Sequence, residues 1–309
     1  MYLFIISISI ILFSEELTIF QIGHLKGDGY YQDIKVEGRY AFVAAGKRGV
    51  IIVDVTDPAS PKELNEIESM DYTYSLDVQG FILFMADGKA GVRIFDIRDI
   101  KNPEQKGFIP TLYSSQSIKI SGQYGYVAEG KGGLRIIDCL NPDFPKEITR
   151  YSKSVNIKAL DIADGYAYLA DKKGVLILDI RNPDSIPDPI QIDAIDSIST
   201  IQSDGRWLFA SGGEKDFIVS NIAVPQYPIT QKIPGGYKEI KDIFLSGFHL
   251  YLAQGDFGIS ILDVLIPYSP EQVNHTIISF EACGIYVSGN LLYIASGYDG
   301  LNIYKITGE

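Results

Sequence analysis

The chain has 309 residues, with 27 lysines and arginines against 39 aspartates and glutamates, and its formal net charge at pH 7 is −12. This acidity argues against a nucleic-acid partner and against electrostatic attraction to an anionic membrane surface. The hydrophobic share of 46% is enough for a large core, and no linker or change of composition divides the chain.

An apolar run occupies residues 2–13 and is followed by Ser14 and two glutamates. Its length suits the hydrophobic region of a signal peptide and is shorter than the roughly 20 residues of a transmembrane helix. No lysine or arginine precedes the run, so the alternative is a first hydrophobic strand. We expect residues 1–14 to be a signal peptide. The mature protein, 15–309, would be a single domain without an integral membrane segment, located in the periplasm, at the cell surface or outside the cell.

The rest of the chain consists of seven repeats. Each repeat contains a large apolar pair followed by alanine, at Ala44, Ala86, Ala128, Ala170, Ala210, Ala253 and Ala295. These alanines are 42, 42, 42, 40, 43 and 42 residues apart. A period of about 40–45 residues made of short strands is typical of β-propeller blades.

The first repeat shows what each blade contains. Residues 33–36 alternate polar and apolar side chains, which predicts a half-buried strand, and Gly38 supplies a tight hairpin turn. Residues 40–44 form a second strand, and the β-branched run 50–54 suits a third strand that is buried on both faces. The prolines that follow mark the turn into a fourth, outer strand.

Four strands in each of seven repeats predict an all-β protein, a seven-bladed β-propeller. The blades are expected near residues 30–70, 71–112, 113–154, 155–195, 196–236, 237–279 and 280–309. The last repeat ends after its third strand, whereas residues 17–22 resemble an outer strand. Pairing of residues 17–22 with 300–306 would close the ring and leave no open strand edge.

The segment from Ala41 to Pro61, AFVAAGKRGVIIVDVTDPASP, and its degenerate copies resemble the LVIVD repeat. The resemblance extends over roughly residues 30–306. It implies a propeller fold and an exported or cell-surface protein, and it implies no particular activity.

Residues with catalytic or metal-binding chemistry do not gather in any recognisable motif. The three histidines occupy unrelated repeat positions, so we expect no metal site, and we expect no cofactor. The aspartates that end the third strands could be catalytic, but a residue that defines the repeat is better explained as the cap of the turn that follows. They are Asp54, Asp96, Asp138, Asp179 and Asp263.

Charges alternate on the first strands of blades one to four, at Lys35, Asp77, Lys119 and Asp161. Because first strands lie nearest the central channel of a propeller, neighbouring blades could pair these charges. The alternative is a channel lined to hold an ion or a small solute.

Two sets of loops are expected on one face of the ring. We call the loops between second and third strands glycine loops, and those that lead from one blade into the next inter-blade loops. Lysines on the first set and tyrosines on the second form the predicted ligand-binding face. The predicted site residues are Tyr31, Lys47, Arg48, Tyr74, Lys89, Tyr113, Lys131 and Lys173.

These observations predict a monomeric, non-enzymatic exported scaffold that recognises a protein or a glycan through this face. Two alternatives stay open. One is a propeller enzyme, a hydrolase or lyase with its site at the channel mouth, since fold does not determine function. The other is a structural subunit of an envelope assembly.

Overall fold

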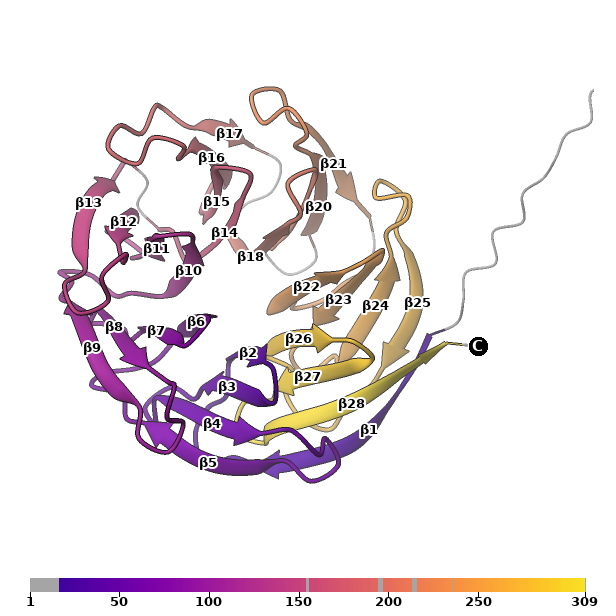
Figure 1. Ribbon diagram of the computed structural model, residues 1–309. Helices are drawn as coiled ribbons and strands as arrows, with labels where there is room; N and C mark the ends of the chain where they lie inside the picture. The colour runs from indigo at the N-terminus through magenta and orange to yellow at the C-terminus, as the bar shows by residue number, and fades with distance from the viewer. Residues whose placement is uncertain (1–16, 154–155, 194–196, 213–215, 235, 309) are drawn as a thin grey trace, which may run out of the picture.

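Seven four-stranded antiparallel sheets are arranged radially around a central axis in the computed structural model of the protein (Figure 1). The structure describes residues 17–153, 156–193, 197–212, 216–234 and 236–308. The predicted signal peptide, residues 1–14, lies outside the described residues. The prediction of a seven-bladed β-propeller is confirmed.

The first three blades follow one another without a change of strand order. Blade one consists of β2 (Asp33–Glu37), β3 (Tyr40–Ala44), β4 (Val50–Asp54) and β5 (Lys62–Ile67). Blade two consists of β6 (Ser75–Gln79), β7 (Ile82–Ala86), β8 (Val92–Asp96) and β9 (Glu104–Ile109). Blade three consists of β10 (Ser117–Ser121), β11 (Tyr124–Ala128), β12 (Leu134–Asp138) and β13 (Lys146–Tyr151).

Blades four to six repeat this order from the innermost strand outwards. Blade four consists of β14 (Ala159–Ala163), β15 (Tyr166–Asp171), β16 (Gly174–Asp179) and β17 (Ile190–Ile192). Blade five consists of β18 (Ile198–Ser203), β19 (Trp207–Gly212), β20 (Asp216–Asn221) and β21 (Ile229–Ile233). Blade six consists of β22 (Asp242–Ser246), β23 (His249–Ala253), β24 (Ile259–Asp263) and β25 (Glu271–Thr276).

The seventh blade combines both ends of the described chain. It consists of β26 (Gly284–Ser288), β27 (Leu291–Ala295), β28 (Gly300–Gly308) and, as its outer strand, β1 (Leu17–Lys26). β1 pairs antiparallel with β28 from Leu17 opposite Gly308 to Lys26 opposite Gly300, as Figure 1 shows for the indigo and yellow strands. The predicted ring closure is therefore confirmed, and the closing strand is longer than the predicted 17–22.

A bulge between Gln21 and Gly23 bends β1 where it passes blade one. Glycine is needed there because a Cβ atom on Gly23 would collide with the carbonyl oxygen of Pro58, in the loop between β4 and β5. Beside the bulge, the Gln21 amide donates a hydrogen bond of 2.6 Å to Asn302 on β28. Side-chain contacts as well as backbone hydrogen bonds therefore hold β1 against β28.

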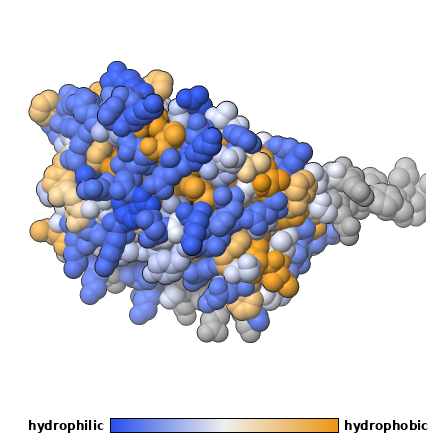
Figure 2. Space-filling view, turned by 90° about the horizontal axis from the view of Figure 1, so that it is seen from below, coloured by the Kyte–Doolittle hydropathy of each residue, from blue (hydrophilic) through white to orange (hydrophobic). Residues whose placement is uncertain are grey.

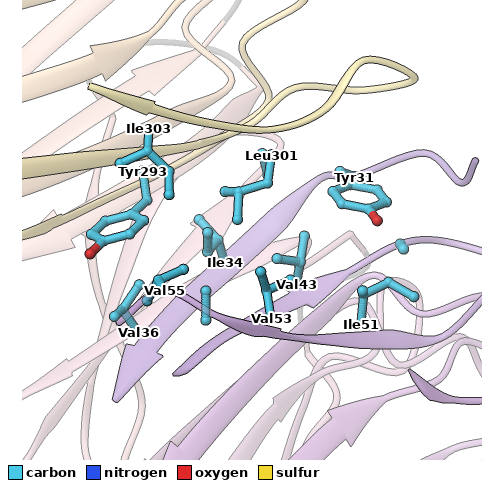
Figure 3. Close-up of a cluster of buried hydrophobic side chains, with 13 residues drawn as sticks. Tyr31, Ile34, Val36, Val43, Ile51, Val53, Val55, Tyr293, Leu301 and Ile303 are labelled. Atoms are coloured by element: carbon cyan, nitrogen blue, oxygen red, sulfur yellow. The ribbon is translucent and has the colours of Figure 1, made fainter. Parts of the chain in front are cut away.

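The core lies between the blades. At the closing seam, Tyr293, Leu301 and Ile303 of blade seven pack against a buried group on blade one, shown in Figure 3. That group includes Ile34, Val43, Ile51 and Val53. Comparable clusters occupy the other six seams. Each blade therefore buries the apolar faces of its middle strands only against its neighbours.

The aspartates that end the third strands cap turns, as predicted. Asp54 accepts a hydrogen bond of 2.8 Å from the backbone N–H of Thr56, and Asp263 accepts one of 2.7 Å from Leu265. Blade five lacks this aspartate, and there Asn221 accepts the equivalent bond from Ala223 at 3.1 Å. The departure in sequence preserves the turn because an amide oxygen accepts as a carboxylate does.

The outer edge of the ring is mostly hydrophilic, with apolar side chains in small, separated groups (Figure 2). The outer strand β5, for example, exposes Lys62, Glu63 and Leu64 and buries only Ile67. No helix in the described part of the chain could cross a lipid bilayer.

Deleting Leu17–Lys26 should strongly destabilise the ring. The deletion exposes the unpaired edge of β28 and uncovers the apolar side chains that β1 packs against, so we expect the unfolding midpoint to fall by about 10 °C or more, with aggregation. Differential scanning calorimetry measures this effect. Phe20→Ser, at a side chain that is 48% exposed on the same strand, is the control and should shift stability by only about 0.5 kcal/mol. An unchanged midpoint after the deletion would contradict the role of β1.

Candidate functional site

The innermost strands of the seven blades surround a central channel of about 490 Å³. Alternate residues of a strand point to the same side, so the side chains at every second position of these strands face the channel. The aspartates and lysines that these strands contribute to its lining are Asp33, Lys35, Asp77, Lys119, Asp161 and Asp242.

The channel aspartates connect neighbouring blades. Asp33 accepts hydrogen bonds from the backbone N–H of Ile34 at 2.8 Å and from that of Leu76, on the next blade, at 3.0 Å. Asp242 repeats this arrangement with Ile243 and, on blade seven, Ile285, both at 2.9 Å.

Two further aspartates act in the same way, but they lie two residues further along their strands. Asp77 accepts from Val78 on its own strand and from Ile120 on blade three, each at 2.9 Å. Asp161 accepts from the backbone and the hydroxyl of Ser203 on blade five. These carboxylates therefore satisfy main-chain donors at the seams, which is a structural role.

The lysines of the channel differ from each other. The Lys35 ammonium lies 3.3 Å from Asp77, which confirms the predicted pairing between blades one and two. Lys119 forms no hydrogen bond or ion pair with any described residue. Burial acts to lower its pKa, but the surrounding carboxylates, Asp161 and Asp77 foremost, outweigh burial and hold that pKa above its ordinary value.

Two carboxyl groups of the channel, Asp242 and Asp161, have a pKa above its ordinary value. Burial, together with the nearby carboxylate of Asp33, raises the pKa of Asp242 to about 7 against the opposing effect of its two backbone hydrogen bonds. Burial likewise raises the pKa of Asp161. Such groups can mark an active site, yet both oxygens of Asp242 are already engaged by main-chain donors.

Four tyrosines gather beside one mouth of the channel. Tyr72 and Tyr74 have ring centroids 4.7 Å apart, and Tyr30 and Tyr298 have theirs 5.1 Å apart in an edge-to-face arrangement. Burial is the main cause that raises the pKa of Tyr72, and the neighbouring Tyr74, Tyr298 and Cys283 act in the same direction. Tyr298 is 78% exposed.

Tyr30 is held in this cluster by hydrogen bonds. Its hydroxyl donates to Glu281 at 2.9 Å and lies 3.4 Å from the thiol of Cys283. Burial is the main cause that raises the pKa of Tyr30, so this hydroxyl stays protonated. The mouth therefore presents neutral phenols, which combine a flat apolar ring with a polar tip.

The glycine loops and the inter-blade loops lie on the same face as this mouth. Isolated backbone bridges join Gly46 to Thr73, Gly88 to Ser115 and Gly130 to Ile157, each between a glycine loop and the inter-blade loop beside it. Six of the eight predicted site residues are exposed on these loops, namely Lys47, Lys89, Lys131, Lys173, Tyr74 and Tyr113.

Two predicted site residues, Tyr31 and Arg48, are engaged within the protein. Tyr31 is fully buried in the seam between blades one and seven, with its backbone bridged to Gly297, because the chain alternates there and turns Tyr30 outward instead. Arg48 is partly buried, and its guanidinium is occupied by ion pairs with Asp28, Glu63 and Glu66. Neither side chain is free to contact a ligand.

Residues outside the predicted set complete the face. Tyr30, Tyr72 and Tyr298 belong to the cluster, but only the ring closure brings Tyr298 of blade seven next to the inter-blade loop of blade one. Within the described ranges, no group of histidine, cysteine, aspartate and glutamate could hold a metal ion. Cys139 and Cys283 are both buried and free.

Comparisons with known proteins support the fold. The LVIVD repeat family matches residues 28–68, 114–153, 157–187 and 281–306, and LVIVD repeats form β-propellers. No curated protein sequence matches the chain.

Two solved structures illustrate the similarity. The β-propeller domain of Cps50 (Swd1) from Myceliophteria thermophila has a TM-score of 0.76 and 14% identity, and the match covers 94% of this chain and all of that one. The computationally designed Ika8 protein has a TM-score of 0.68 and 8% identity, with 92% of this chain and 99% of that one covered. At such identities the similarity shows the fold alone.

The acidity of Asp242 makes stability depend on pH. Folding raises the pKa of Asp242 to about 7, so the folded state keeps a proton that the unfolded state releases from about pH 4 upward. The contribution of this group to the free energy of unfolding is therefore present at low pH and is lost as pH rises through 7. Asp242→Asn removes the titration. Urea unfolding should show wild type losing stability relative to this variant between about pH 4 and pH 8. The exposed turn variant Asp57→Asn is the control, and parallel profiles for wild type and Asp242→Asn would contradict the assignment.

Proposed function

We propose that this LVIVD-repeat propeller is an exported, non-enzymatic scaffold that binds an anionic partner, a protein surface or an acidic glycan, through one face of the ring. We call this surface the tyrosine–lysine face. It comprises Tyr30, Tyr72, Tyr74, Tyr113, Tyr298, Lys47, Lys89, Lys131 and Lys173. The proposal rests above all on one observation, that unpaired lysines lie beside exposed tyrosines on loops of successive blades.

The lysines of this face carry positive charge that no ion pair with a described residue neutralises. Lys47, Lys89 and Lys131 occupy the same slot in the glycine loops of blades one to three, and none forms an ion pair with a described residue. The arginines of the same blades behave differently: Arg93 and Arg135 are buried and paired with Asp87 and Glu129. In a chain with a net charge of −12, such an arc attracts an anionic partner selectively.

The tyrosines supply contact area. Tyr74 is 37% exposed and Tyr113 is 42% exposed, and each lies beside a lysine-bearing loop. The ring of Tyr72 lies against Gly46, and that of Tyr113 lies against Gly132, so the flat glycine loops support the aromatic rings. Rigid rings held in this way lose little conformational entropy on binding, which favours them as anchors.

The channel supports binding over catalysis. Its four aspartates are occupied by backbone donors of the seams, and Lys35 is paired with Asp77. A catalytic pair would need a free acid and base within reach of a substrate. Lys119 lacks such a partner among the described residues, but the carboxylates beside it, Asp77 and Asp161, are engaged, and the exposed polar groups of the mouth are those of Tyr74, Tyr298 and the lysines.

Replacing Lys47, Lys89 and Lys131 together by glutamate should weaken capture of a partner from cell-envelope fractions by at least about tenfold, because attraction becomes repulsion across the face. Folding should be unchanged, since exposed substitutions shift stability by about 0.5 kcal/mol. The matched control changes Lys62, Lys101 and Lys146, exposed lysines away from this face, and should retain capture. Raising the salt concentration should reproduce the first variant. Equal capture by both triple variants would exclude this face.

Export makes a separate prediction about the N-terminus. If residues 1–14 are a signal peptide, protein recovered from the cell envelope should begin at or near Glu15. N-terminal sequencing measures this directly. Recovery of cytoplasmic protein that starts at Met1 would contradict export and would leave the binding face to be judged by the lysine variants.

A further inference from the structure

Blades two and three fill a particular space with an arginine. On β8, Arg93 donates to the carbonyl oxygen of Glu68 in the inter-blade loop at 2.6 Å and to the Gln105 side chain at 3.0 Å, and it pairs with Asp87 at 3.3 Å. In blade three, Arg135 donates to the carbonyl oxygen of Pro110 and pairs with Glu129. The guanidinium thus occupies the space between the third strand, the outer strand and the inter-blade loop.

Blade six has the same framework without the arginine. Ser260 takes the position of Arg93, Gln254 takes that of Asp87, and Gln272 lies opposite Leu262 just as Gln105 lies opposite Phe95. A pocket of about 490 Å³ lies beside this smaller side chain. It is lined by Gly236, Tyr237, Lys238, Phe257, Gln272 and His275 together with Gln254 and Ser260.

A chain of hydrogen bonds determines the orientation of the histidine. Gln254 donates to the carbonyl oxygen of Lys238 at 3.2 Å, so its own oxygen faces Ser260, whose hydroxyl donates to it at 2.5 Å. The Ser260 hydroxyl has then used its only proton, and the contact of 3.0 Å with Nδ1 of His275 requires that Nδ1 donates. A neutral His275 therefore carries its proton on Nδ1 and keeps Nε2 as a free acceptor.

The pocket contains unused groups of two kinds. The Gln272 amide forms no hydrogen bond with any described residue, and His275 forms none besides that from Nδ1. Phe257 is 41% exposed and Tyr237 is half-buried, which provides apolar ring surface. Among the described residues, no carboxylate lines the pocket, and the Lys238 ammonium lies 4.8 Å from the Phe257 ring centre, so a cationic ligand is disfavoured.

We propose that this pocket of blade six binds a neutral pyranose ring of a glycan. A pyranose has a C–H face that packs on an aromatic ring and hydroxyl groups that both donate and accept hydrogen bonds. The Gln272 amide can donate and accept, and Nε2 of His275 can accept, so both can serve such hydroxyls. Pockets of about 300–1,000 Å³ are of the size that holds small ligands.

The pocket is independent of the tyrosine–lysine face. It lies on the glycine loop and the outer strand of blade six and on the inter-blade loop that leads into this blade, on the same side of the ring as the tyrosine–lysine face but with no residue in common with it. The inference therefore does not rest on the proposed function, and failure of either leaves the other standing.

Saturation-transfer NMR with the full chain tests the proposal, with the methyl glycosides of glucose, galactose, mannose and N-acetylglucosamine as probes. At least one glycoside should bind with a Kd of about 1 mM, as expected for a ligand with about a dozen non-hydrogen atoms. Glycerol, which has hydroxyl groups but no ring, should give no signal. Glucuronic acid tests for preference of an acidic sugar.

Two variants locate the binding. Ser260→Arg with Gln254→Asp restores the pair that fills blade two, so it should fold and abolish the signal. Phe257→Ala introduces the alanine that blade two carries at Ala90 and should weaken binding about fivefold or more. Phe81→Ala, at a side chain that is 65% exposed on another blade, is the control and should bind as wild type does.

The possible results are distinct. Loss of the signal in both pocket variants and its retention in the control support the proposal. Absence of a response to every glycoside, an unchanged response in the pocket variants, or a response to glucuronic acid alone would each overturn the assignment of a neutral pyranose site.

Discussion

The burial of apolar side chains between neighbouring blades is the constraint on which the whole structure depends. A single four-stranded blade has two apolar faces and cannot cover either by itself. Ile51 of blade one, for example, packs against the last blade, while Ile52 on the same strand packs against blade two. Because every blade needs two neighbours, the ring must close, and the pairing of β1 with β28 makes the last seam equivalent to the others.

Closure of the ring also determines where function can lie. The seams bury the apolar faces of the strands. The channel aspartates accept hydrogen bonds from main-chain donors at the inner edges, as Asp33 does from Leu76. The loops are the part of each repeat that this packing does not constrain. Binding groups on these loops can therefore differ from blade to blade at little cost in stability.

Much of the fold could be predicted from the sequence because packing imposes a strict repeat. The period, the strands of blade one and the closing strand all follow from apolar patterns that recur in register. The role of Asp54 also followed, because a turn cap depends on residues only two positions away. Contacts of short range in sequence, or repeated at a fixed interval, are the ones that a single chain reveals.

The site was less predictable because it depends on single orientations and on contacts that differ between blades. Tyr30 and Tyr31 are adjacent and chemically alike, yet one enters the seam and the other the surface cluster. Arg48 resembles Lys47 in the sequence, and only the structure shows that Asp28, Glu63 and Glu66 neutralise it. Blade six carries the same lesson further: Ser260 stands where blades two and three carry Arg93 and Arg135, and only the structure shows that a pocket lies beside it.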